Sequence, residues 1–127
     1  MEFTFNNKSS RDFNIKIKKS NHLSIPRRKI ELVEVQGRTD NLIVDEGARE
    51  MLDIEIEAYI DCRNEDTYSY ALRLDKWLNG VNGYSNLVFD DNTNLKAIFV
   101  GQIDFNSITK NFEEILLQFK AYREGDL

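Results

Sequence analysis

The stretch MLDIEIEAYI, residues 51–60, alternates apolar and polar side chains without a break. One set of alternate positions carries Leu52, Ile54, Ile56, Ala58 and Ile60, and the other carries Asp53, Glu55, Glu57 and Tyr59. A period of two places these sets on opposite faces of a β-strand. The stretch therefore predicts a strand with one buried and one solvated face, as in an antiparallel sheet.

Similar patterns on both sides of this stretch predict further strands. Phe13, Ile15 and Ile17 alternate with polar residues, and so do Ile115, Leu117, Phe119 and Ala121. The stretch from Leu95 to Gln102 is apolar at nearly every position, which is typical of a central strand. The shorter candidates are Phe3 to Phe5, Ile30 to Val35, Leu42 to Val44 and Ser85 to Phe89.

One segment, from Thr67 to Val81, has helical periodicity instead. Its apolar residues are Tyr70, Ala71, Leu74, Trp77, Leu78 and Val81, which share one side of a helix. Asn64 is a candidate N-cap, and Gly80 and Gly83 can end the helix. We expect a mainly β fold, a β-sandwich or split-barrel-like arrangement of antiparallel sheets, with one amphipathic helix packed on the sheet.

Length and composition restrict the possible functions. The 127 residues suit a single domain spanning residues 1–127, with 41% hydrophobic and 31% charged residues. The net charge of −5 argues against nucleic-acid binding as the main task. The single cysteine, Cys62, excludes a disulfide framework and a cysteine-rich zinc site. No stretch is long and apolar enough for a membrane helix, and the start does not resemble a signal peptide.

The sequence offers little for catalysis. His22, the only histidine, lies in a polar stretch, and we expect an exposed loop residue there. The acidic groups Asp53/Glu55/Glu57, Asp90/Asp91 and Glu113/Glu114 could in principle serve a hydrolase, but a regular solvated strand face explains the first group better. No phosphate-binding loop, nucleophile elbow or cofactor motif is present. We therefore expect no enzyme activity, cofactor or metal.

Several short motifs, in order along the chain, resemble the N-terminal ring domain of siphophage distal tail proteins. They are Phe3-Thr4-Phe5-Asn6-Asn7 followed by Ser9 to Ile15, Val35-Gln36-Gly37-Arg38-Thr39-Asp40-Asn41-Leu42, Val44-Asp45-Glu46-Gly47, Trp77-Leu78-Asn79-Gly80, and Leu87-Val88-Phe89-Asp90-Asp91. The sequence departs from the family pattern at Gln36, where proline is usual, at Asp40-Asn41, where Asp-Gly is common, and at Asn7, where glycine is frequent. Many family members carry a second, C-terminal β domain, often galectin-like, which these motifs do not cover.

The resemblance implies a structural role in the tail tip of a phage or a phage-like particle. Family members form a hexameric ring that joins the tail tube to the tip or baseplate and surrounds the path of the DNA. The implied partners are further copies of the chain, the tail tube protein, the tape-measure protein and tail-tip or baseplate proteins. The implied location is the virion tail tip, after synthesis in the cytoplasm of the bacterial host, with no membrane contact and no specific nucleic-acid binding.

Two groups of residues are candidate sites for this role. We expect the ring interface in the polar segment from Gln36 to Glu50, read as a loop, with Gln36, Gly37, Arg38, Asp45 and Gly47 as candidates. Asp53, Glu55 and Glu57 are candidates for an acidic lumen that repels DNA phosphates. The alternative is a monomeric carbohydrate- or peptide-binding module of the tail tip, to which Tyr59, Tyr68 and Tyr84 could contribute an aromatic groove.

Overall fold

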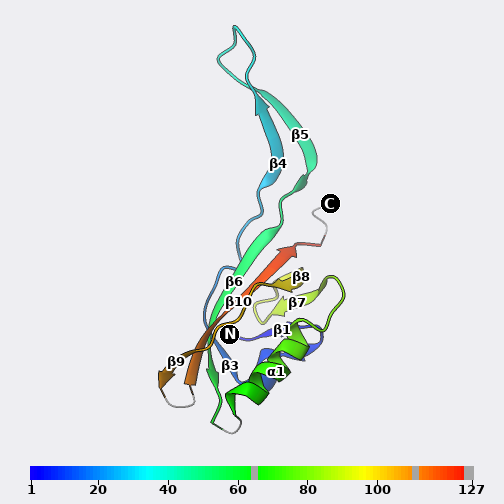
Figure 1. The fold of residues 1–127 in the computed structure, drawn as a ribbon. Coiled ribbons are helices and arrows are strands. Elements are labelled where there is room, and N and C mark those ends of the chain that lie inside the picture. Colours follow the sequence, from blue (N-terminus) through cyan, green and yellow to red (C-terminus); the bar gives the residue numbers. More distant parts are fainter. Residues whose placement is uncertain (64–65, 110–111, 125–127) are drawn as a thin grey trace.

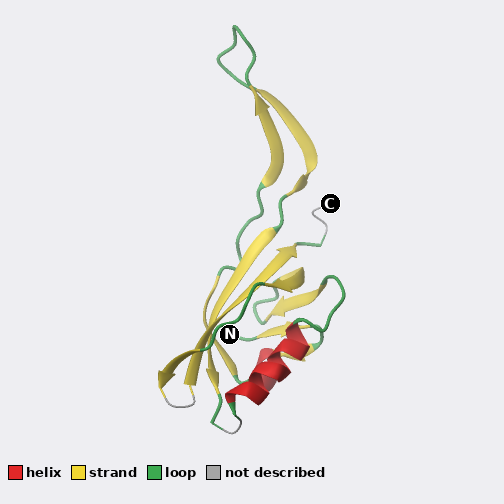
Figure 2. Ribbon diagram, in the orientation of Figure 1, coloured by secondary structure: helices red, strands yellow, loops and turns green. Residues whose placement is uncertain are grey.

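The computed structural model describes residues 1–63, 66–109 and 112–124, and strands dominate it (Figures 1 and 2). In chain order the elements are β1 (Phe3–Phe5), β2 (Lys8–Ser9), a 3-10 turn (Ser10–Phe13), β3 (Ile15–Ser20), β4 (Arg28–Val33), β5 (Leu42–Arg49), β6 (Leu52–Asp61), α1 (Thr67–Leu78), β7 (Ser85–Phe89), β8 (Asn94–Val100), β9 (Asn106–Thr109) and β10 (Phe112–Tyr122). The mainly β fold class with one helix is confirmed.

Two hydrogen-bonded sheets are formed by these strands. The larger has the order β2-β1-β7-β8-β10-β6-β3, with β9 pairing to β10 beyond the end of β8. The strand pairings among its described residues are antiparallel. The smaller sheet is the β4–β5 hairpin alone, which projects away from the rest of the molecule (Figure 1).

The strands β6 and β10 form the centre of the main sheet. They pair over ten positions, with Ile54 opposite Phe119 and Ile56 opposite Leu117. These four side chains are almost fully buried, whereas Asp53 and Glu55 on the other face of β6 are exposed. The alternation in residues 51–60 therefore separates a core face from an outward face, as predicted.

Helix α1 covers the core face of the sheet (Figure 2). Its N-cap is Asp66, whose carboxylate accepts hydrogen bonds from the backbone N–H and the hydroxyl of Ser69. The hydrogen bond from the Ser69 backbone N–H lowers the pKa of Asp66, and the hydrogen bond from the Ser69 hydroxyl lowers it further. The predicted cap, Asn64, lies outside the described residues, and the helix ends at Leu78, three residues before the predicted end.

Two polar atoms on the buried side of α1 fix the helix to the N-terminal segment. The indole N–H of Trp77 donates to the carbonyl of Phe5 at 2.8 Å, and the hydroxyl of Tyr70 donates to the carbonyl of Phe13 at 2.5 Å. The Phe13 ring also stacks on Trp77 with centroids 4.2 Å apart. These bonds satisfy buried carbonyl groups that would otherwise cost about 1–3 kcal/mol each. No helix in the described part of the chain could span a membrane.

Candidate functional site

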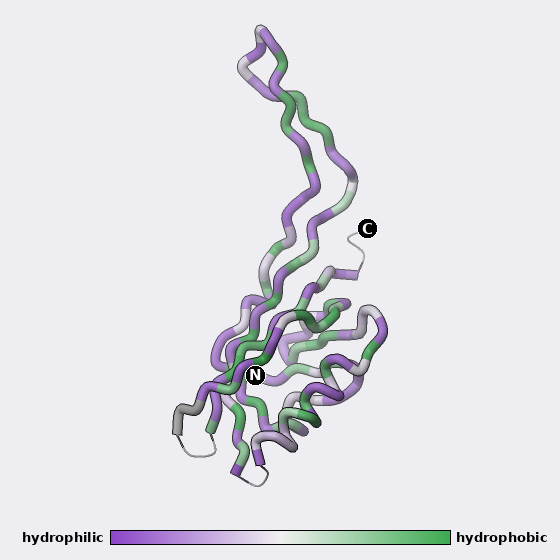
Figure 3. Tube along the Cα trace, in the orientation of Figure 1, coloured by the Kyte–Doolittle hydropathy of each residue, from purple (hydrophilic) through white to green (hydrophobic). Residues whose placement is uncertain are grey.

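Both strands of the β4–β5 hairpin contain hydrophobic residues (Figure 3), and the structure leaves their side chains exposed. Six aliphatic side chains on it are between 36% and 63% exposed, namely Ile30, Leu32, Val33, Leu42, Ile43 and Val44. A contiguous exposed apolar surface of this kind marks an interaction site more often than an ordinary solvated surface.

The strand register divides these six side chains between the two faces of the hairpin. Leu32 lies opposite Ile43, and Ile30, two residues from Leu32, shares their face. Val33 lies opposite Leu42 on the other face, together with Val44. Both faces of the ribbon are therefore apolar. A single two-stranded hairpin is at best marginally stable in water, and an apolar ribbon of this kind is a candidate interaction surface.

The lower part of the hairpin contains a bulge that is held by Asp45. The register shifts between Arg28 and Ile30, and Gly47 has a φ of 75°, a conformation that glycine adopts without strain. The Gly47 backbone N–H donates to Asp45 at 2.8 Å, and Arg28 forms an ion pair with the same carboxylate. The hydrogen bond from the Gly47 backbone is the largest cause that lowers the pKa of Asp45, and the hydrogen bond from Arg28 lowers it further.

All five predicted interface residues lie on the hairpin, but in two different settings. Gln36, Gly37 and Arg38 lie in the loop at its tip, where Arg38 pairs with Asp40 at 2.7 Å. Asp45 and Gly47 lie within β5. The prediction of a loop from Gln36 to Glu50 was therefore wrong in extent, because the bulge interrupts the period-two pattern of β5. That these residues form an interface stays a prediction.

The base of the hairpin joins a small aromatic pocket. Tyr84 packs edge-on against Tyr122 with centroids 5.2 Å apart, and its hydroxyl contacts the sulfur of Met51 at 3.6 Å. Lys29, Ala48, Arg49 and Glu50 complete the lining. Tyr84 is 49% exposed and Met51 37% exposed. The apolar surface of the hairpin therefore continues onto the body of the molecule.

The outward face of the main sheet carries Asp53, Glu55 and Glu57, as the strand pattern predicted. Lysines share this face, since Lys120 forms an ion pair with Asp53 and Lys19 lies opposite Glu57 on β3. Lys18 pairs with Glu114 at 3.3 Å, and its pKa is raised first by that hydrogen bond. The face is thus of mixed charge. In the described residues no group of three or more His, Cys, Asp or Glu side chains could hold a metal ion.

His22 is buried, so the expectation of an exposed loop residue was wrong. Only 4% of it is exposed, and its ring stacks on Phe89 with centroids 3.9 Å apart. Its Nε2 lies 2.7 Å from Asp91 and its Nδ1 lies 2.8 Å from the hydroxyl of Ser20. The His22 hydrogen bond is the main cause that lowers the pKa of Asp91 to about 2.

Serine, histidine and aspartate here match the residue types of a hydrolytic triad, but their arrangement does not. The histidine ring is enclosed against Phe89, and only 4% of the residue is exposed. A nucleophilic serine must be reachable by substrate. The cluster instead fastens the end of β3 to the β7–β8 turn, which lies far from β3 in the sheet order.

The three tyrosines proposed for an aromatic groove are not brought together. Tyr59 lies on the outward sheet face beneath Lys18, Tyr68 lies on the exposed side of α1, and Tyr84 lies at the hairpin base. Cys62 is buried, as expected for an inert thiol. The exposed hairpin and the outward sheet face are therefore the surfaces with the strongest claim to a function.

Comparison with known proteins identifies the fold. No family model matches the sequence, and no curated protein matches it. Among solved structures, the Dit protein (gp 19.1) of phage SPP1, described as a paradigm of the hub adsorption apparatus in phages infecting Gram-positive bacteria, superposes with a TM-score of 0.77 at 12% identity. The match covers 98% of this chain and 50% of SPP1 Dit, so the chain spans about half the length of that protein. The resemblance to distal tail proteins is confirmed at the level of the fold.

Proposed function

We propose that this chain is a non-catalytic structural component of a phage or phage-like tail tip. In this role it forms a ring, most simply a hexamer, that connects the tail tube to the tip or baseplate and surrounds the DNA exit path. The fold shared with SPP1 Dit supports the tail role. The observation that carries the ring is the β4–β5 hairpin, whose aliphatic side chains are exposed on both faces.

Covering the hairpin provides a driving force for assembly. Fully burying an aliphatic side chain stabilises by about 1.5–3 kcal/mol relative to leaving it exposed, so six half-exposed chains offer roughly 5–9 kcal/mol. Association costs about 4–15 kcal/mol in lost freedom, so the hairpin supplies a large part of what one interface requires. A head-to-tail contact repeated around an axis closes into a ring.

The assembly test measures the mass of the full chain by light scattering and its shape by electron microscopy. The native chain should form ring-shaped particles with a mass that is a multiple of 14.9 kDa. The double variant Leu32→Glu/Ile43→Glu places two charges on one hairpin face and should remain folded but monomeric. The matched control Leu116→Glu changes an exposed residue of the sheet face and should still assemble. A native chain that stays monomeric at every concentration would refute the ring.

The outward sheet face is our candidate for the wall of the DNA path. Two of its lysines, Lys18 and Lys120, are paired with Glu114 and Asp53, which leaves these two less available to phosphates. Replacing Asp53, Glu55 and Glu57 together by lysine should slow DNA ejection from assembled particles. Unchanged ejection kinetics in a variant that still assembles would remove these residues from the path.

A further inference from the structure

Two Asn-Gly pairs, Asn79-Gly80 and Asn82-Gly83, lie in the segment that joins α1 to β7. No other asparagine of the chain is followed by glycine. Asparagine is a thermolabile residue, and it is least stable before glycine, because the next backbone nitrogen can attack the side-chain amide and glycine has no side chain to hinder it. All four residues are exposed, so exposure does not distinguish the two pairs.

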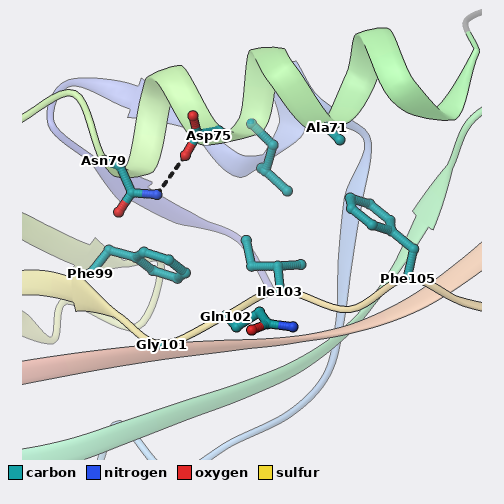
Figure 4. A pocket seen from close by; sticks show the side chains of 9 residues that line it. Ala71, Asp75, Asn79, Phe99, Gly101, Gln102, Ile103 and Phe105 are labelled. Atoms are coloured by element: carbon teal, nitrogen blue, oxygen red, sulfur yellow. Dashed lines mark hydrogen bonds between the residues drawn. The ribbon is translucent and has the colours of Figure 1, made fainter.

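The first pair is held at the C-terminal end of α1. The side-chain amide of Asn79 donates to the carboxylate of Asp75 at 2.7 Å (Figure 4), and its backbone N–H donates to the Asp75 carbonyl at 2.8 Å. Gly80 lies against the last turn of the helix, since a Cβ there would come within 2.3 Å of the carbonyl oxygen of Lys76. Contacts with the helix therefore restrain both the amide and the glycine that would attack it.

The second pair has no such restraint. Among the described residues, no hydrogen bond reaches the side chain of Asn82 or the backbone N–H of Gly83. Gly83 has a φ of 100°, and a Cβ there would meet no heavy atom within 4 Å apart from its chain neighbours. The backbone nitrogen and the amide can therefore approach each other without breaking a contact of the fold.

We propose that Asn82 is a site of spontaneous deamidation in the folded chain, and that its hydrogen bond to Asp75 protects Asn79. The backbone nitrogen of Gly83 loses its proton and forms a bond to Cγ of Asn82, and the side-chain nitrogen takes up a proton and leaves as ammonia. Water then opens the resulting succinimide at either carbonyl, which gives aspartate or isoaspartate. The reaction requires only the chain and water.

The fold can accept this modification. Asn82 and Gly83 lie between α1 and β7, outside both elements. Aspartate adds one negative charge to the net charge of −5, and isoaspartate also adds one carbon atom to the main chain. Neither product removes a hydrogen bond found in the described part of the chain. Modified chains should therefore stay folded and accumulate.

The new charge would lie close in sequence to the base of the β4–β5 hairpin. Tyr84, two residues after Asn82, packs on Tyr122 and contacts Met51 there. The chemistry does not depend on the role of the chain. A component of an assembled particle is not replaced by new synthesis, however, so under the proposed function the product would build up with the age of the particle.

Peptide mapping by tandem mass spectrometry tests the assignment, because it measures the product at each asparagine separately. The full chain is incubated under native conditions at mildly alkaline pH, which favours loss of the Gly83 proton. Asn82 should be converted several-fold faster than Asn79. In urea, where neither pair keeps its contacts, the two rates should become similar. Equal native rates, faster conversion of Asn79, or conversion of Asn82 in urea alone would overturn the proposal.

Two variants test the cause of the difference. Asp75→Ala removes the carboxylate that holds the Asn79 amide, so it should raise the conversion of Asn79 about two- to tenfold, the effect of losing one hydrogen bond, and leave Asn82 unchanged. The matched control Asn82→Gln lengthens the side chain by one methylene, so it should abolish rapid conversion at position 82 and keep the native rate at Asn79. An Asn79 rate that Asp75→Ala does not change would overturn the protection.

A third variant tests whether the modified chain persists. Asn82→Asp carries the charge of the product and should unfold at the same temperature as the native chain, since Asn82 makes no hydrogen bond among the described residues. A large drop in the unfolding temperature would overturn the expected accumulation. None of these measurements depends on assembly, so they stand or fail separately from the proposed ring.

Discussion

Apolar side chains are buried in the body of the molecule and exposed in its β4–β5 hairpin. In the body, β6 and β10 bury one side chain in two, and Ile54, Ile56 and Leu117 are fully enclosed. In the hairpin, β4 and β5 contain aliphatic residues at similar density, yet none of them is buried. Both are antiparallel ribbons of one chain. The difference is that the body packs its apolar surface against itself, while the hairpin has nothing of its own to pack against.

Under the proposed function, this contrast separates residues that serve folding from residues that serve assembly. Removing a core side chain should lower the stability of the isolated chain, whereas removing a hairpin side chain should affect association alone. The following substitutions test that division, beginning with the largest expected effect on the free energy of unfolding.

The strongest test of the body is Phe119→Ala. Phe119 is 1% exposed and its ring contacts Phe3, Phe5 and Phe99, with centroids 5.1–6.3 Å apart. Truncating a buried phenylalanine costs about 3–5 kcal/mol, a large share of the total stability of a small domain. Urea unfolding followed by circular dichroism measures the loss. Leu116→Ala, on the other face of the same strand, is the control and should change the free energy by less than about 0.5 kcal/mol.

A smaller loss is expected for Tyr70→Phe, which removes one oxygen. The Tyr70 hydroxyl is fully buried and donates to the carbonyl of Phe13, so its removal leaves that carbonyl without this donor. The expected cost is about 1–3 kcal/mol in the free energy of unfolding. Tyr68→Phe makes the same change two residues away at a position 73% exposed and should cost almost nothing. Equal losses in the two variants would contradict the assigned role of the Tyr70 bond.

The His22–Asp91 pair should make stability depend on pH in the acid range. The pKa of Asp91 is lowered from 3.8 to about 2, mainly by the His22 hydrogen bond and further by Thr93. A carboxyl whose pKa is lower in the folded state stabilises above its unfolded pKa, and that contribution is lost as the pH falls from about 4 to about 2.

Asp91→Asn should therefore weaken the decline of stability over this range, as measured by thermal unfolding at a series of pH values. The control is Asp90→Asn, which changes the neighbouring carboxyl but keeps the His22 pair and should keep the decline. If both variants decline as steeply as the native chain, the pair does not contribute as the geometry indicates.

The body was the more predictable of the two regions, because its sequence pattern reports its packing. Strict alternation in residues 51–60 gave β6, and helical spacing gave α1 from its first residue, Thr67. The strand Ser85–Phe89 was predicted with its observed bounds. Each of these elements buries one face, so its apolar residues recur with the period of a strand or a helix and can be recognised in the sequence.

The remaining features depend on contacts between distant parts of the chain. His22 was assigned to an exposed loop because its partner, Asp91, is 69 residues away and no local pattern joins them. Strand β9 was missed because it is short and bonded only at the edge of β10. The extent of β5 was missed because the Asp45–Gly47 bulge breaks the alternation. The six aliphatic residues of the hairpin were placed in predicted strands, but an apolar strand pattern does not show whether its side chains are buried or exposed.

The smallest effect on unfolding, and the sharpest test of the division, is expected for Ile43→Ser. Ile43 is 63% exposed, the highest value among the six aliphatic hairpin residues, and lies opposite Leu32 on one hairpin face. In dilute protein the free energy of unfolding should change by less than about 0.5 kcal/mol, as for other exposed sites. In concentrated protein the same variant should assemble more weakly than the native chain, because the lost side chain belongs to the surface that is covered there. A dilute-solution loss as large as that of Phe119→Ala would mean that the hairpin packs on its own body, and the distinction between a self-packed body and a partner-packed hairpin would then fail.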